Sequence, residues 1–231
     1  KGGGLIGEGH MALANGPGGT IVGTGAVALT IDLGANTLTN SGLIENTRAG
    51  GTTIAGAVSN VGSLEALGGQ LTVAGAVSGP GGAVIGGGAT IDFAAAFSQK
   101  VSFIAGGGTL ELAKSQAYAG TINGFSHTGA TALDLGDIAF AGATKATYSG
   151  TTAAGILTVT DGAHTAHIHL SGNFTNSTWT LSSDGHGGTK VVDPAALVTA
   201  MAGFGTSDAA QAAATGPPAP NHRPILASPG A

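Results

Sequence analysis

The sequence predicts an all-β protein built on a parallel β-solenoid (β-helix), and three observations support this. First, LTNSGLIE at residues 38–45 returns as VSNVGSLE at 58–65, twenty residues later. Second, TIAGAVS at 53–59 returns as TVAGAVS at 72–78, nineteen residues later. Third, short runs of β-branched or apolar residues alternate with Gly, Asn and Thr, which is the pattern of strands joined by tight turns. A unit this short cannot bury its own apolar face, so successive copies must stack as coils.

The same unit extends in both directions and assigns residues 1–140 to the solenoid. GPGGTIVGTGA at 16–26 returns as GPGGAVIGGGA at 79–89, a distance of about three coils. Beyond residue 94 the unit lengthens, and GTLEL at 108–112 is followed by TALDL at 131–135. At ~20 residues per coil and a rise of ~4.8 Å, we expect about seven coils in a rod about 30–35 Å long. Residues 1–9 are too glycine-rich to close the first coil, so we expect that end to be open to strand addition, by a neighbour's end or by the upstream part of a longer chain.

Residues 141–192 show a different pattern, which predicts an antiparallel β cap. The segments 156–160 and 165–170 flank Asp161-Gly162, a strong signal for a two-strand hairpin. The segments 178–181 and 189–192 flank a longer glycine-rich loop and predict a second hairpin. Because an uncovered solenoid end exposes unpaired strand edges, hairpins that include the single Trp are a plausible cover for that end.

The remaining residues predict a short helix and a tail. Asp193-Pro194 is a typical helix start, with Asp as the N-cap and Pro at the first position, so we expect a helix over 193–205. Residues 206–231 are rich in Ala and Pro, a composition typical of a chain without regular structure.

Composition excludes several functional classes. The chain has 231 residues, of which 44 are Gly and 8% are charged, with a net charge of −5. Seven Lys and Arg form no basic patch, so nucleic acid is not an expected partner. Without cysteine there is neither a disulfide framework nor thiol catalysis. No apolar run approaches the ~20 residues that span a membrane. The chain starts at Lys1 without a signal peptide, so we expect a processed chain or a piece of a longer one.

Three segments resemble the C-terminal region of large β-strand-repeat surface proteins of proteobacteria. They are LDLGDIAF at 133–140, LTVTDG at 157–162 and SDGHGGT at 183–189, and the resemblance covers about residues 38–205. The resemblance implies an adhesin-like or S-layer-like protein, of a kind often exported by type I secretion. It therefore places the chain outside the cell or on a bacterial cell surface.

Candidate metal ligands are few. His167 and His169 lie two apart on an expected strand, so both project from one face and can bind zinc or copper if a third ligand joins them. An exposed strand rich in Thr and His is the simpler interpretation. For calcium, GGGATID at 86–92 comes nearest to a calcium-binding glycine–aspartate repeat, without tandem copies. We expect no cofactor, with calcium as the alternative. We expect four carboxylates to point outward from separate strands: Asp32, Asp92, Glu111 and Asp134.

The functional hypothesis is a non-enzymatic extracellular structural protein, adhesin-like or matrix- or filament-forming. We expect a homo-oligomer or a head-to-tail polymer in which the solenoid ends meet, with a cell surface or a glycan as a further partner. The alternative is a monomeric fragment whose tail folds back on its own rod. Leu5 and Ile6 would contribute one end of the contact, and Phe204, Ile225 and Leu226 the other. Catalysis is not expected.

Two alternatives remain open. A carbohydrate-active β-helix enzyme, a polysaccharide lyase or hydrolase, would need a cleft with convergent carboxylates. Residues 5–110 contain only Arg48 and Lys100 as bases, which disfavours a lyase. A carbohydrate-binding module would need a row of exposed aromatic side chains, whereas Phe93 and Phe103 stand at apolar strand positions.

Overall fold

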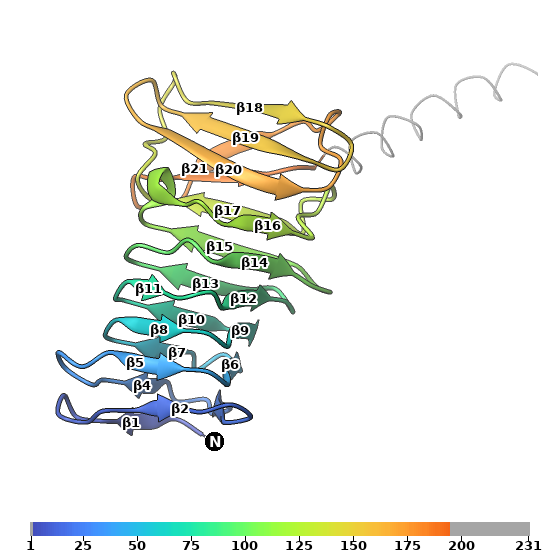
Figure 1. The fold of residues 1–231 in the computed structure, drawn as a ribbon. Helices are drawn as coiled ribbons and strands as arrows, with labels where there is room; N and C mark the ends of the chain where they lie inside the picture. Colours follow the sequence, from blue (N-terminus) through green and yellow to red (C-terminus); the bar gives the residue numbers. More distant parts are fainter. Residues whose placement is uncertain (1, 195–231) are drawn as a thin grey trace, which may run out of the picture. The chain divides into compact units, whose positions relative to one another are not determined.

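A computed structural model describes residues 2–194, and these form a β-solenoid of about six turns (Figure 1). The strands belong to three sheets, here called A, B and C. Sheet C has four strands: β2 (Ala14–Asn15), β5 (Leu38–Asn40), β8 (Val58–Asn60) and β11 (Val77–Ser78). The predicted parallel β-solenoid is therefore confirmed. It has about one turn fewer than expected, because several coils are longer than twenty residues.

Sheets A and B have nine strands each. In order along the stack, sheet A consists of β3 (Thr20–Gly23), β6 (Leu43–Thr47), β9 (Ser63–Gly68), β12 (Gly82–Ile85), β14 (Lys100–Phe103), β16 (Thr121–Asn123), β20 (Thr165–Ser171), β19 (Ala154–Thr160) and β18 (Lys145–Gly150). Sheet B consists of β1 (Gly4–Ile6), β4 (Leu29–Ile31), β7 (Thr52–Ile54), β10 (Gln70–Val73), β13 (Ala89–Phe93), β15 (Gly108–Leu112), β17 (Thr131–Leu135), β22 (Thr189–Val192) and β21 (Thr180–Ser183). A single 3₁₀ turn, η1 (Ser115–Ala117), lies on the side that sheet C occupies in earlier coils.

The sequence repeat sets the strand register. Thr52 lies opposite Leu71, nineteen residues on, and Leu110 lies opposite Leu133, twenty-three residues on. Because the register is in phase, every second side chain of each coil points inward onto its equivalent in the next coil. One such row in sheet B is Ile31, Ile54, Val73, Phe93, Leu112 and Leu135, at most 2% exposed. The core is thus a column of stacked apolar layers.

Side-chain amides form a second column at the end of sheet C. Asn15 Nδ2 donates to Asn40 Oδ1, Asn40 Nδ2 to Asn60 Oδ1, and Asn60 Nδ2 to Gln99 Oε1, each at 2.7 Å. All four side chains are buried. The coil between Asn60 and Gln99 has Gly79 at this position, and the longer Gln side chain reaches past it. We call this column the amide ladder.

Gln99 ends the amide ladder. Its Nε2 donates to the carbonyl oxygens of Asn60, Ser78 and Gly79 at 2.9, 3.0 and 2.8 Å. The backbone carbonyl oxygen of Gln99 accepts a hydrogen bond from the Tyr118 hydroxyl at 3.1 Å. Burial raises the pKa of Tyr118 above its usual value, so this hydroxyl stays a donor. Both polar atoms of the Gln99 side chain therefore have hydrogen-bond partners within the solenoid.

Glycines beside the amide ladder let the coils approach closely. A Cβ on Gly42 would lie 2.2 Å from the Gly19 carbonyl oxygen, and one on Gly62 would lie 2.0 Å from that of Gly42. Gly81 continues this row, 2.5 Å from the oxygen of Gly62. Any side chain here would push neighbouring coils apart and lengthen the ladder hydrogen bonds.

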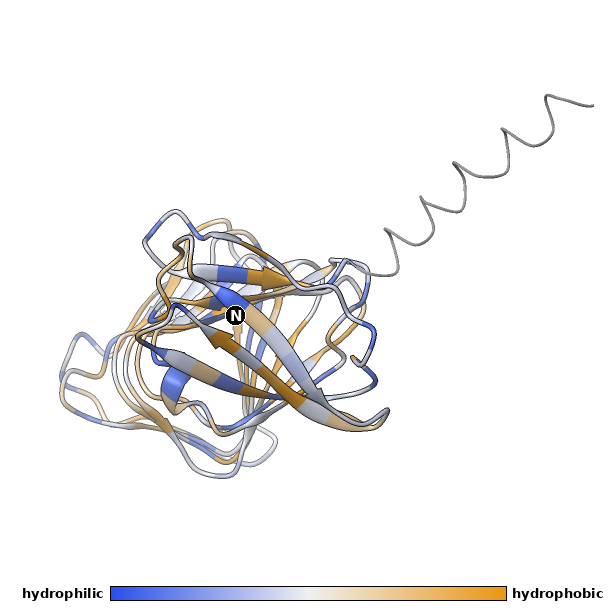
Figure 2. Ribbon diagram, turned by 90° about the horizontal axis from the view of Figure 1, so that it is seen from above, coloured by the Kyte–Doolittle hydropathy of each residue, from blue (hydrophilic) through white to orange (hydrophobic). Residues whose placement is uncertain are grey.

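The last strands change direction and lie across the end of the stack (Figures 1 and 2). β19 pairs antiparallel with β20 across the turn at Asp161-Gly162, and β18 pairs antiparallel with β19. β21 and β22 form a second antiparallel pair, and β22 joins β17. We call β18–β22 the terminal layer. The helix expected over 193–205 lies outside the described residues, except for its first two.

Aromatic side chains fill the space under the terminal layer. Phe174 is 2% exposed, and its ring centroid lies 5.8–6.2 Å from those of Phe125, Tyr148 and Trp179. Aromatic pairs at such distances contribute beyond their buried area. This cluster seals the C-terminal end of the solenoid core.

Candidate functional site

The N-terminal end is the first candidate site, because its strands are paired on one edge only. Among the described residues, β1 pairs with β4 and β2 with β5, while β3 pairs with β6 and touches Gly2 in a single bridge to Gly23. The Gly4 amide donates to Ala28 O at 2.9 Å, and Ile6 O accepts from Asp32 N at 2.8 Å. Since alternate residues of a parallel strand bond to opposite sides, the N–H and C=O of Leu5 face the open edge.

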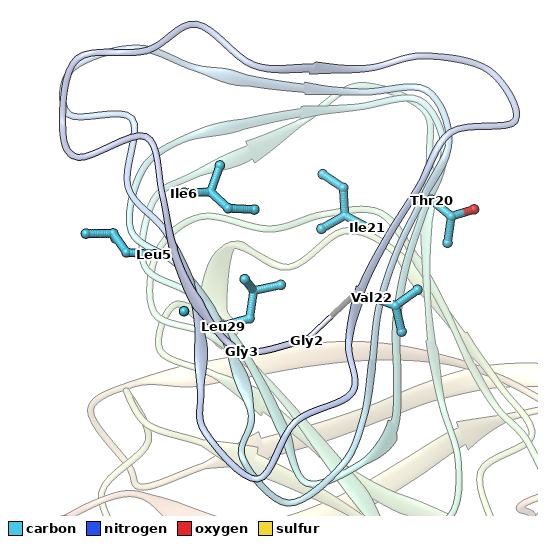
Figure 3. Close-up of a pocket in the computed structure, with 9 residues that line it drawn as sticks. Gly2, Gly3, Leu5, Ile6, Thr20, Ile21, Val22 and Leu29 are labelled. Atoms are coloured by element: carbon cyan, nitrogen blue, oxygen red, sulfur yellow. The ribbon is translucent and has the colours of Figure 1, made fainter.

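A hollow of about 300 Å³ opens at this end. Ile6, Ile21 and Leu29 point into it from β1, β3 and β4, while Leu5 points away (Figure 3). Leu5 is 56% exposed. The predicted assembly residues Leu5 and Ile6 thus lie at the open end. Phe204, Ile225 and Leu226, predicted for the other end, lie outside the described residues.

A row of carboxylates is the second candidate site. Asp92, Glu111 and Asp134 are directly opposite one another on β13, β15 and β17. They point outward, as expected, yet they form one continuous row. On β10, β7 and β4 the same row is continued by Thr72, Thr53 and Thr30. The outer face of sheet B therefore divides into a threonine half and an acidic half.

The carboxylates of this row have raised pKa values. Desolvation by burial is the largest cause for all three. The charges of Asp92 and Asp134 raise the pKa of Glu111 further, and His186 partly offsets this increase. Asp184 raises the pKa of Asp134. Lys190, which lies opposite Asp134 on β22, lowers it. A proton is therefore held more tightly along this row than on an ordinary carboxylate.

A buried carboxylate joins the terminal layer to the last coil. Asp193 is 0% exposed, and its Oδ2 lies 2.8 Å from His127 Nδ1 and accepts a hydrogen bond from Ser177 Oγ. Its Oδ1 accepts from the Thr178 amide at 3.3 Å, and its carbonyl from Gly129 at 3.0 Å. Sequence reasoning missed this contact, because 66 residues separate His127 from Asp193 and no motif links them.

The predicted histidine pair lies on the outer face of β20. His167 and His169 are both exposed, and His167 Nδ1 lies 3.2 Å from Thr158 Oγ1. In the part of the chain that the structure describes, no three His, Cys, Asp or Glu side chains are grouped to hold a metal ion. Metal binding at this pair, and calcium binding elsewhere, stay predictions.

Comparisons with known proteins give no relative. No family model, curated protein or solved structure matches the chain. The resemblance to repeat surface proteins therefore rests on the three quoted segments. Within residues 2–194, no helix is long and apolar enough to cross a membrane.

Proposed function

We propose that this is a non-enzymatic structural protein that acts outside the cell or on a bacterial surface and joins a larger filament or matrix through its solenoid ends. The observation that carries the proposal is that β1, β2 and β3, the first strands that the structure describes, each pair along one edge, apart from a single bridge between Gly2 and Gly23. An unpaired strand edge is a template for strand addition, whether by a neighbouring copy or by an upstream part of a longer chain. The hollow beside these strands adds the side chains of Ile6, Ile21 and Leu29, which a contact would remove from water.

The low charge of the chain also favours association. Only 8% of the residues are charged, so electrostatic repulsion between copies is weak. A head-to-tail contact of two different surfaces gives an open filament when the rotation does not close. Adhesion to a cell surface or a glycan would then be repeated along the filament.

Static light scattering of the full chain over a range of concentrations tests this proposal. We expect association that the Leu5→Pro variant weakens, because Pro removes the N–H at the open edge of β1 without touching its bonds to β4. The matched control is Phe140→Ser, which changes a residue 45% exposed elsewhere and should associate like the parent. Deleting 206–231 measures the contribution of the tail. A parent chain that stays monomeric at high concentration would end the proposal.

A carbohydrate-active enzyme is the second candidate, and the carboxylate row favours it. Neighbouring strands lie ~4.8 Å apart, close to the ~5 Å between the two carboxyl groups of retaining glycosidases. A raised pKa suits a general acid. The enzyme hypothesis ranks second because the carboxylate row lies on an open strand face. The hollow at the N-terminal end is not lined by these carboxylates, and neither is a second hollow that lies beside Val61 and Ser102. Release of reducing ends from a polysaccharide panel, abolished by Glu111→Gln, would establish it.

A further inference from the structure

Asp134 carries a buried acceptor without a donor. It is the last carboxylate of the acidic half of sheet B, on β17, and no described residue donates a hydrogen bond to its Oδ1. A second carboxyl group, that of Asp184 in the loop between β21 and β22, lies within hydrogen-bonding reach of it. Two ionised carboxylates cannot bond to each other, because both are acceptors only. A single proton between them turns this contact into a hydrogen bond.

Gly188 lets the Asp184 side chain lie against β17. It ends the hairpin loop that begins at Asp184, and the two residues are joined by a backbone hydrogen bond from Asp184 N to Gly188 O at 3.3 Å. A Cβ on Gly188 would lie 2.4 Å from Asp184 Oδ2 and 2.8 Å from Leu135 O. Any side chain at this position would therefore separate the loop from the last coil and move the two carboxyl groups apart.

The surroundings of the two carboxyl groups place the proton on Asp134. Asp184 Oδ1 accepts hydrogen bonds from the His186 amide at 2.7 Å and from the Gly188 amide at 2.9 Å, which fix this side chain as an acceptor. Burial is the largest cause of the raised pKa of Asp134, and the charge of Asp184 and a side-chain hydrogen bond with Asp184 raise it further. Asp134 is therefore the donor of the pair, and Asp184 is the acceptor.

Other charged groups face Asp134 from each neighbouring element. Glu111 lies opposite it on β15 and Lys190 lies opposite it on β22, while Asp184 and His186 belong to the hairpin loop. Burial and the charge of Asp184 raise the pKa of Asp134 by more than Lys190 and His186 lower it. A proton on Asp134 also removes its repulsion with Glu111, so the acidic half of sheet B favours the protonated form.

We propose that Asp134 and Asp184 share one proton, and that this proton fastens the β21–β22 hairpin to the last coil. We call the pair the carboxyl clasp. Its contribution is fully present below pH ~4 and is lost as the pH rises through the raised pKa of Asp134. Since β17 pairs with β15 on one edge and with β22 on the other, loosening of the hairpin uncovers an edge of β17. The pH thereby sets how often the C-terminal end of the stack opens.

Hydrogen exchange of the segment 180–192 in the full chain tests the clasp, expressed as a protection factor at pH 4 and at pH 7. In the parent we expect protection to fall about fivefold between the two. Asp134→Asn gives Asp184 a permanent N–H donor, so its protection should stay high at both pH values. Asp134→Ala supplies no donor and should be about fivefold less protected than Asp134→Asn at both. Equal protection of the two variants would mean that charge repulsion alone acts, and would overturn the proposal.

A control and a second measurement complete the test. His127 and Asp193 also titrate, beyond the other end of β22, and the Asp134 variants leave this pair in place. Asp92→Asn removes a carboxylate of the same row, two strands from Asp134, and should keep the fall in protection of the parent. Carboxyl ¹³C NMR of the parent needs no variant, and Asp134 should titrate above its ordinary value of 3.8. Titration of Asp134 at or below that value, or a parent whose protection does not change with pH, also contradicts the clasp.

Discussion

The two ends of the solenoid are built from different interactions. At the C-terminal end the strands turn antiparallel, aromatic rings fill the core, and Gln99 completes the amide ladder. At the N-terminal end the first described strands pair along one edge, and the core opens into a hollow. A stack of similar coils continues until a different structure covers its last edge. The terminal layer is such a cover at the C-terminal end, whereas the first described strands can still pair with a further coil, from a longer chain or from a neighbouring copy.

The largest effect should come from the sealed end. Replacing Phe174 with Ala removes the centre of the aromatic cluster and should lower the free energy of unfolding by about 3–5 kcal/mol. Replacing Ile21 with Ala at the open end should cost about 1 kcal/mol, because this side chain is only partly buried beside the hollow. Denaturant unfolding measures both. Equal losses would mean that the N-terminal end is as well packed as the C-terminal end.

A smaller effect is expected at the coil contacts inside the stack. In Gly62→Ala the new Cβ overlaps the Gly42 carbonyl oxygen, 2.0 Å away, so the free energy of unfolding should fall by about 1–3 kcal/mol. The matched variant Gly16→Ala lies near the open end, where no atom is within 4 Å of the new Cβ. It should be neutral in the same unfolding assay. A loss at Gly16 as large as that at Gly62 would contradict a row of close contacts restricted to the interior.

The smallest effect concerns the acidic half of sheet B. Because the folded-state pKa values of Asp92, Glu111 and Asp134 are raised, the native state binds more protons than the unfolded chain above pH ~4. This part of the stability should increase as the pH falls from neutral through the raised pKa values toward the ordinary ones. Glu111→Gln should add about 0.5 kcal/mol at pH 7, a small figure because the row is partly exposed to solvent.

Melting temperatures measured between pH 4 and pH 7 check this prediction. The Glu111→Gln variant should show a flatter pH profile than the parent. Thr53→Ser, in the threonine half of the same row, should keep the parent profile. An unchanged profile for Glu111→Gln would show that the three carboxylates do not interact.

The sequence predicted the coils well because their repeat is local. Copies nineteen and twenty residues apart specify parallel pairing, and the strands of residues 38–93 pair in parallel. The amide ladder was missed, although Asn40 and Asn60 recur in the quoted repeat. Asn15 and Gln99 lie 25 and 39 residues from their ladder partners, so the period of nineteen to twenty residues did not connect them with Asn40 and Asn60.

The functional features depend on register, which the sequence pattern gives only approximately. Glu111 follows Asp92 by nineteen residues and precedes Asp134 by twenty-three, so their contact could not be inferred from one fixed period. The pair of His127 and Asp193 is more distant still and depends on how the terminal layer folds back. The open N-terminal end was expected from its glycines, although Gly4–Ile6 do form a strand there.

Gln99 also has a consequence for how such a protein changes length during evolution. Upstream of it, the coils around Asn40 and Asn60 present the same amide, the same glycine and the same apolar layers to both neighbours. A duplicated gene segment encoding one of these coils would find matching contacts above and below. Between Gly79 and Gln99 no such copy fits, because the Gln side chain bridges one fixed gap. An added coil would therefore keep the amide ladder intact if it were inserted before Asn60, and would break the Asn60–Gln99 hydrogen bond if it were inserted between these two residues.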